Sequence, residues 1–309
     1  MSSHYSLLST YYSLLSNMNA NNQNTGISGI LAANIEPIEL ADGMLFGEGP
    51  VWDKQHQQLI FSDTGANEHK SWSETQGLQT YRKPSYQPNG NVLDSAGNLY
   101  TCEHETRAIS ITDKDDRRTI LCDRFQGQQF NSPNDLEIKS DGTIWFTDPP
   151  YGLGDRTQEI DFNSVFRYAP KTQELTVVVK DLSMPNGIAF SPDEAKLYVG
   201  NSAAGDRYIW VFTVNSDGTL SAGEKLCQID NNDWGADGVD VDANGNIYAG
   251  CGDGVHIFSP TGLLLGKILT PSAISNFAFG GEDGKTLFMT SEHALYRIEL
   301  LVAGAVRRW

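Results

Sequence analysis

One sequence pattern recurs six times along the chain, and it limits the possible folds more than any other feature. Each copy has a polar residue beside Gly or Pro, a short alternating strand, a turn rich in Asp, Gly or Asn, and a second strand. Consecutive copies lie about 40–50 residues apart, a spacing typical of strand-only repeats. Alignment of the copies places six residues in one column: Glu48, Asn89, Asn134, Asn186, Asp237 and Asn276.

Strand-only repeats of this length predict an all-β fold, a six-bladed β-propeller with one four-stranded sheet per blade. The closed propeller would form one domain over residues 36–303, and a strand near Glu36–Leu40 would complete the last blade. Residues 304–309 would form a C-terminal tail. The 30 glycines suit a fold with many turns.

Residues 1–35 lack the repeat and are predicted to form an N-terminal extension. The motif YSLLS occurs at Tyr5–Ser9 and again at Tyr12–Ser16, which places the leucines of both copies on one helical face. An Asn-rich linker follows them. Either this segment is a frayed terminal helix, or it docks on the propeller body or on a second subunit, which would give a homodimer.

The first strand of each propeller blade lies along the central channel, so the six column residues would form a ring at one mouth of that channel. The ring holds two carboxylates and four asparagines, and it holds no Lys, Arg, Cys or His. Two carboxylates this close raise one another's pKa unless a cation balances them. An all-oxygen ligand set favours Ca²⁺, with Mg²⁺, Mn²⁺ or Zn²⁺ as possible substitutes, although Zn²⁺ would normally recruit His or Cys.

A competing interpretation is that the asparagines of the column only shape the blade turns. Repeated turn chemistry would account for several of them. It accounts poorly for Glu48, because Glu is not a favoured turn residue. A cation-binding ring is therefore the preferred interpretation of the column.

Further polar residues follow the second strand of several repeats, where they would surround the ring. Glu103 and His104 form one such pair, and Tyr151 occurs in the segment TDPPYG. His104 would act either as a proton donor or acceptor toward a substrate or in simple hydrogen bonding. Tyr151 would form either a pocket wall or a loop contact. The sequence has no serine-hydrolase elbow, P-loop or dinucleotide-binding motif.

The formal net charge is −17, and a surface this acidic repels phosphate backbones and anionic lipids. We therefore expect no nucleic-acid and no membrane partner. No stretch approaches the roughly 20 apolar residues of a membrane span, and the N-terminus lacks a signal-peptide pattern. The four cysteines have no CxxC spacing, which favours free thiols in a reducing compartment. These features predict a cytoplasmic protein.

Several segments of the chain resemble the gluconolactonase/regucalcin (senescence marker protein) family of six-bladed propellers, and bacterial gluconolactonases most of all. The segments are FGEGPVW, TCEHETR, FNSPNDLEIKSDGTIWFTDPPYG, MPNGIAFSPDEAKLYVGNS, GADGVDVDANGNIYAGCGDGVHIF and SNFAFGG. The resemblance implies a Ca²⁺-type metal held by Glu48, Asn186 and Asp237, with Asn134 contacting the metal or the substrate. Asp237 matches the proposed general base. The animal branch of the family carries an Arg where this chain has Ser132.

This resemblance implies hydrolysis of a sugar lactone such as glucono-1,5-lactone, the activity of a gluconolactonase-type carboxylic ester hydrolase. Asp237 would take a proton from the attacking water, and His104 would assist at the leaving oxygen. The residues expected to contact substrate are Asn134, Asn89, Glu103, Tyr151 and Asn276. Two alternatives stay open: an organophosphatase or paraoxonase-like esterase on the same metal site, and a propeller that binds calcium or another ligand without catalysis.

Overall fold

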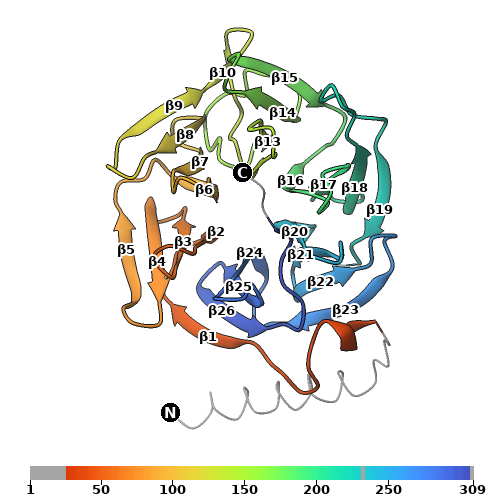
Figure 1. Cartoon of the computed structure of the whole chain (residues 1–309). Helices are drawn as coiled ribbons and strands as arrows, with labels where there is room; N and C mark the ends of the chain where they lie inside the picture. The colour runs from red at the N-terminus through yellow and green to blue at the C-terminus, as the bar shows by residue number, and fades with distance from the viewer. Residues whose placement is uncertain (1–25, 231–233, 307–309) are drawn as a thin grey trace.

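The computed structural model describes residues 26–230 and 234–306, which form six four-stranded antiparallel sheets. Figure 1 shows these sheets arranged as blades around a common axis. The predicted all-β, six-bladed β-propeller is confirmed. The predicted helix over the first part of the N-terminal extension lies outside the described residues, and the homodimer through it stays a prediction.

Five blades are built from consecutive strands, and the innermost strand comes first in each. The first blade has β2 (Gly47–Asp53), β3 (Gln58–Asp63), β4 (Glu68–Ser73) and β5 (Gly77–Arg82), and the second has β6 (Pro88–Leu93), β7 (Leu99–Glu103), β8 (Ala108–Thr112) and β9 (Arg118–Cys122). The third blade has β12 (Leu136–Ile138), β13 (Ile144–Asp148), β14 (Ser164–Ala169) and β15 (Glu174–Val179), and the fourth has β16 (Pro185–Phe190), β17 (Lys196–Asn201), β18 (Tyr208–Thr213) and β19 (Glu224–Gln228). The fifth blade has β20 (Val239–Val241), β21 (Ile247–Cys251), β22 (Gly254–Phe258) and β23 (Leu264–Leu269). A short hairpin of β10 (Arg124–Phe125) and β11 (Gln128–Gln129) connects the second blade to the third.

The sixth blade closes the propeller with strands from both ends of the sequence. Its inner strands are β24 (Ile274–Gly280), β25 (Thr286–Ser291) and β26 (Ala294–Glu299), and β1 (Ile38–Asp42) pairs antiparallel with β26 as the outer strand. The expected closing strand near Glu36–Leu40 is therefore present. Pairing between strands from the two ends of the sequence ties the last blade to the start of the chain and closes the propeller.

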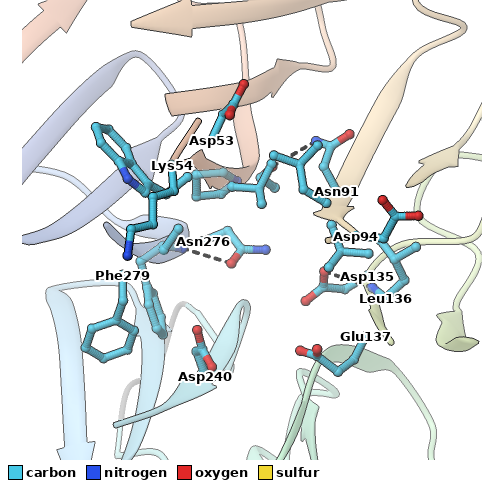
Figure 2. Close-up of a pocket in the computed structure, with 18 of the residues that line it drawn as sticks. Asp53, Lys54, Asn91, Asp94, Asp135, Leu136, Glu137, Asp240, Asn276 and Phe279 are labelled. Carbon is cyan, nitrogen blue, oxygen red and sulfur yellow. Dashed lines mark hydrogen bonds between the residues drawn. The ribbon is translucent and has the colours of Figure 1, made fainter. Parts of the chain in front are cut away.

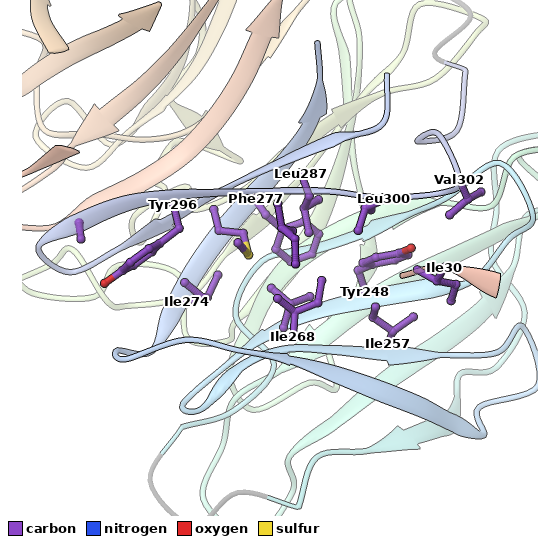
Figure 3. Close-up of a cluster of buried hydrophobic side chains, with 14 residues drawn as sticks. Ile30, Tyr248, Ile257, Ile268, Ile274, Phe277, Leu287, Tyr296, Leu300 and Val302 are labelled. Atoms are coloured by element: carbon purple, nitrogen blue, oxygen red, sulfur yellow. The ribbon is translucent and has the colours of Figure 1, made fainter. Parts of the chain in front are cut away.

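The segment before β1 packs against the fifth and sixth blades. It begins with the short 3-10 helix η1 (Ile27–Gly29), and the next residue, Ile30, is buried in a cluster that includes Tyr248, Ile257 and Leu300 (Figure 3). The backbone N–H of Leu301 donates to the carbonyl of Ile30 at 2.8 Å. Residues before Glu36 therefore contribute to the core, while the predicted domain limits of 36 and 303 stay a prediction.

The backbones of neighbouring blades are in close contact just after the column residues. The N–H of Gly90 donates to the carbonyl of Asn134 at 2.8 Å, and the N–H of Gly187 donates to that of Asp237 at 2.9 Å. A Cβ on Gly187 would lie 2.3 Å from the Asp237 carbonyl oxygen, which is closer than atoms can pack. Glycine is required at this position because each inner strand lies against the backbone of the next blade.

Two further expectations from composition concern the cysteines and membrane spans. All four cysteines are free thiols, and Cys102, Cys227 and Cys251 are buried. No helix within residues 26–230 and 234–306 is long and apolar enough to cross a membrane.

Candidate functional site

The six column residues come together at the axis of the propeller and form the predicted ring. All six side chains are buried, and each lies within two residues of the start of the innermost strand of its blade. Asn134 Nδ2 donates to Asn186 Oδ1 at 2.7 Å, and Asn276 Nδ2 donates to Glu48 Oε2 at 3.3 Å. These bonds join side chains from different blades, so the fold, and not local sequence, assembles the ring.

The surroundings of the two ring carboxyl groups, Glu48 and Asp237, disfavour their ionised forms. Burial raises the pKa of Glu48 well above its usual range, and the nearby charge of Asp237 raises it further. Burial also raises the pKa of Asp237 to about 7, although a hydrogen bond from Asn186 opposes the shift. Two buried acids with raised pKa values, one of which raises the pKa of the other, form a site that a cation would stabilise.

Asp135 is a third carboxylate near the ring that the column alignment passed over. Its oxygens accept the N–H groups of Leu136 at 3.0 Å and Ile188 at 3.4 Å. Burial raises its pKa to about 7, and its charge raises the pKa of both Glu48 and Asp237. The sequence held a signal for it: the residue after the column position is Gly in four repeats, whereas here it is Asp.

Trp234 is a second residue near the ring that the sequence patterns did not single out. Its side chain hydrogen-bonds to Asp237 and thereby lowers the pKa of that carboxyl. Because the indole N–H can only donate, this bond favours the ionised form of Asp237. Trp234 stands three residues before Asp237, outside the repeat, so periodicity gave no reason to choose it.

Tyr151 reaches the ring from the loop after β13. Its side chain hydrogen-bonds to Ser202 and Asn186, and burial raises the pKa of its hydroxyl to about 12. Ser202 Oγ also accepts a 3.2 Å hydrogen bond from Asn186 Nδ2. Tyr151 is 41% exposed, so it lies between the ring and solvent.

His104 and Asn89, both from the second blade, carry buried atoms without hydrogen-bond partners. These atoms are His104 Nε2 and Asn89 Oδ1. Burial lowers the pKa of His104 to about 4, with a smaller contribution from the charge of Arg156, so its imidazole is neutral near pH 7. Buried polar atoms seldom lack partners. A polar ligand would supply the missing hydrogen bonds to these two atoms.

Glu103 and several polar residues at the ends of second strands are engaged in structural contacts. The carboxylate of Glu103 accepts hydrogen bonds from Arg118, Thr106 and Ser110. Asp148 accepts the N–H of Asn131 at 2.8 Å, so it holds the loop that leads into its own blade. The structure therefore places Glu103 in a satisfied network of the second blade, separate from the bonds that link the ring.

Ser132 braces the loop that carries Tyr151. Its hydroxyl donates to the carbonyl of Pro149 at 2.6 Å and accepts the N–H of Gly152 at 2.8 Å. The position at which the animal branch carries an Arg is thus a buried support for the TDPPYG loop in this chain.

The chemistry of the ring fits a hard divalent cation. Within the described ranges, no group of three or more His, Cys, Asp or Glu side chains could hold a metal ion. The ring combines two mutually repelling carboxylates with the amide groups of Asn134 and Asn186 instead. This all-oxygen donor set suits Ca²⁺ better than Zn²⁺.

A cavity of about 620 Å³ lies on the other side of the ring, toward the far ends of the inner strands. We call the face where the inner strands begin the upper face and the opposite face the lower face. Figure 2 shows the carboxyl groups of Asp135, Glu137 and Asp240, together with the Asn276 amide, facing this lower cavity.

Comparisons with known proteins agree with the fold. The family model described as "SMP-30/Gluconolactonase/LRE-like region" matches residues 46–293. A gluconolactonase from Zymomonas mobilis is 37% identical over 295 residues, which cover 87% of this chain and 82% of the relative. The structure of a gluconolactonase from Xanthomonas campestris matches with a TM-score of 0.83 at 33% identity, covering 89% of this chain and 92% of that chain. A regucalcin from Agrobacterium tumefaciens, at 18% identity and a TM-score of 0.74, covers 88% of this chain and 96% of its own and shares the fold.

Proposed function

The chain belongs to the SMP-30/gluconolactonase/LRE-like family, and from this membership and the ring we propose that it hydrolyses sugar lactones such as glucono-1,5-lactone. The observation that carries the proposal is the pair of buried carboxylates, Glu48 and Asp237, whose pKa values are both raised on the propeller axis. A buried acid pair among amides is costly for folding and suits a site for charge-stabilised chemistry.

Glu48, Asn134, Asn186 and Asp237 would hold a divalent cation, and Ca²⁺ fits their oxygens best. When bound, the cation would supply Lewis-acid polarisation of the lactone carbonyl and stabilisation of negative charge. Mg²⁺ and Mn²⁺ are weaker candidates, and Zn²⁺ is the least suited of the four because the ring offers neither His nor Cys.

Asp237 is the group in this ring best placed to take a proton from an attacking water. Its carboxylate is oriented by hydrogen bonds from Asn186 and Trp234, which leave it in one arrangement at the axis. An ionised carboxylate that is held in place by such donors can accept a proton from a nearby water. This side chain therefore serves both as a ligand and as the base.

The amides and Tyr151 would position the sugar. Asn89 offers an unpartnered carbonyl oxygen to a hydroxyl, and Asn134 and Asn276 present amide groups on other sides of the axis. His104 is neutral near pH 7, so it would act as a hydrogen-bond partner of the leaving oxygen and not as an imidazolium acid. The carboxylate of Glu103 is engaged by Arg118, so Glu103 would support the side of the site that His104 and Asn89 form.

A pH-stat assay after chelation tests the proposal. The protein is treated with a chelator and assayed on several aldonolactones, an aryl ester and an organophosphate, with add-back of Ca²⁺, Mg²⁺, Mn²⁺ or Zn²⁺. We expect lactone hydrolysis to disappear on chelation and to return most fully with Ca²⁺. Turnover of only the ester or the organophosphate would identify an esterase of the paraoxonase type. Cation binding without turnover would identify a binding propeller.

A further inference from the structure

A long loop reaches the ring on the upper face. It connects β13, which ends at Asp148, to β14, which begins at Ser164. Residues 149–163, all within the described part of the chain, contain no helix or strand. Near the start of the loop, Tyr151 hydrogen-bonds to Ser202 and Asn186 on the fourth blade. Connections of this length are uncommon in compact domains, and many of them carry function.

The same loop packs against His104 of the second blade. His104 directly follows β7 and is buried. A Cβ on Gly152 would lie 2.3 Å from His104 Cγ and 2.4 Å from its Nδ1, so the imidazole lies directly against the backbone of the loop. A side chain at this position would force the two apart. The loop therefore joins the second blade to the fourth, with a contact to His104 on one side and the contacts of Tyr151 on the other.

Arg156, farther along the loop, holds both sides of the contact with His104. Its guanidinium donates four hydrogen bonds to backbone carbonyls. On the second blade, Nη2 donates to the carbonyl of His104 and Nη1 to that of Glu105, both at 2.9 Å. Within the loop, Nε donates to the carbonyl of Leu153 at 2.9 Å, and Nη2 also donates to that of Gly152. One side chain therefore fastens the backbone of the loop to the backbone that carries His104.

The shape of the guanidinium explains how one side chain makes all of these bonds. It carries five N–H donors spread around one rigid plane and has no acceptor, so carbonyls can approach it from several directions. A lysine has the same charge, but its three donors are on a single nitrogen. That nitrogen cannot span carbonyls placed around the whole edge of a guanidinium. The substitution Arg156→Lys therefore separates the charge of this residue from its geometry.

We propose that Arg156 is a positioning residue of the site, which fastens the loop to the second blade and thereby places Tyr151 and His104 together on the upper face of the ring. Arg156 acts through these two side chains, because its own donors are engaged by backbone carbonyls. The inference rests on the proposed lactonase function, in which Tyr151 positions the sugar and His104 bonds to the leaving oxygen. Release of the loop should therefore weaken substrate binding and slow the reaction as well.

Steady-state kinetics of Arg156→Met on glucono-1,5-lactone in the presence of Ca²⁺ tests the role of this residue. We expect KM to rise several-fold and kcat to fall about tenfold, because small displacements of positioning groups have large effects on rate. Arg156→Lys should show the same losses. Arg117 is the matched control, because it is an exposed arginine between β8 and β9 that pairs with Asp113 and Asp115. Arg117→Met should leave KM and kcat unchanged.

The change in KM distinguishes positioning from a loss of folded protein. A partly unfolded variant has fewer active molecules, so its apparent kcat falls while its KM stays the same. The rise in KM should also depend on Tyr151. In a Tyr151→Ala background, Arg156→Met should raise KM little further, because the group that it places is already gone.

Hydrogen exchange tests the attachment of the loop without an assay of activity. We expect the amides of residues 152–156 to exchange several-fold faster in Arg156→Met and in Arg156→Lys than in the parent, because fewer bonds hold the loop closed. Arg117→Met should exchange at the parent rate. A protein that shows this pattern but hydrolyses no lactone would refute the proposed function and leave the attachment of the loop by Arg156 in place.

Several results would overturn the inference. Exchange at the parent rate in Arg156→Met would mean that other contacts hold the loop. Parent-like KM and kcat in Arg156→Lys would mean that the charge of Arg156, and not the shape of its guanidinium, acts on the site. A lower kcat with an unchanged KM would reduce Arg156 to a structural role. Additive effects of Arg156→Met and Tyr151→Ala on KM would mean that Arg156 does not act through Tyr151.

Discussion

The side-chain amide of Asn134 donates a 2.7 Å hydrogen bond to Oδ1 of Asn186, a residue 52 positions later in the chain. Asn186 in turn hydrogen-bonds to Asp237. One line of side chains therefore connects the third, fourth and fifth blades at the axis. Because each member orients the next, a substitution in this line is expected to change both cation binding and the alignment of the base.

Asp237→Asn is expected to separate the two roles of this residue. The amide keeps an oxygen for a cation but cannot accept a proton from water, so we expect lactonase activity to fall at least about 100-fold. Asp237→Ala removes the oxygen as well and should also weaken cation binding. A pH-stat assay combined with calorimetric titration of Ca²⁺ measures both effects, and full activity in either variant would refute the role of Asp237 as the base.

Asn134→Asp tests whether Asn134 contacts the cation. The substitution removes the donor to Asn186 and adds a third carboxylate to the ring, so the cation-free protein should be less stable than the parent. Ca²⁺ should then raise the melting temperature by more than it does in the parent, because binding to the folded state stabilises it. Asn134→Ala is the matched control and should show a smaller rise. An equal rise in the parent and in Asn134→Asp would assign Asn134 to the substrate alone.

Trp234→Phe is expected to shift the pH dependence of catalysis. The indole bond lowers the pKa of Asp237, so its loss should raise that pKa and move the rising limb of kcat/KM to higher pH. Trp210→Phe makes the same change on β18, in a tryptophan whose Nε1 has no partner, and should leave the profile in place. Parallel profiles of the parent and Trp234→Phe would show that the indole does not act through Asp237.

Gly187→Ala is expected to destabilise the contact between the fourth and fifth blades. The new methyl group would lie 2.3 Å from the Asp237 carbonyl oxygen and 2.4 Å from the Val239 nitrogen. We expect the free energy of unfolding to fall by about 1–3 kcal/mol, the usual cost of overpacking. Gly29→Ala is the control, because a Cβ there meets nothing within 4 Å. Denaturant unfolding compares the two, and an equal loss in both variants would contradict the close approach of the blades.

Asp148→Asn is expected to become relatively more stable as the pH rises. Burial raises the pKa of Asp148 from 3.8 to about 7 in the folded protein. The stability that this carboxyl contributes is therefore fully present below its unfolded pKa and is lost as the pH rises toward the folded pKa. Asn does not titrate, so the difference in melting temperature between variant and parent should shift in favour of the variant from about pH 5 to about pH 8. A difference that is constant with pH would contradict the raised pKa.

The sequence by itself determined the repeat, the number of blades and the composition of the ring. A strand places every second residue on one face, and a repeat places the same register at the same depth in every blade. For this reason the alignment that put Glu48, Asn186 and Asp237 in one column also put them at one level of the axis.

Only the tertiary structure decided which partners these residues have. Glu103 ends its strand, as other polar residues end or follow theirs, yet Arg118, two strands away, engages its carboxylate. Asp135 and Trp234 lie outside the column, and they act on Asp237 because their backbones bring them to the axis. Periodicity specifies the depth and face of a side chain. The loops and packing between blades specify its contacts, and these depend on residues that are distant in the sequence and differ from one repeat to the next.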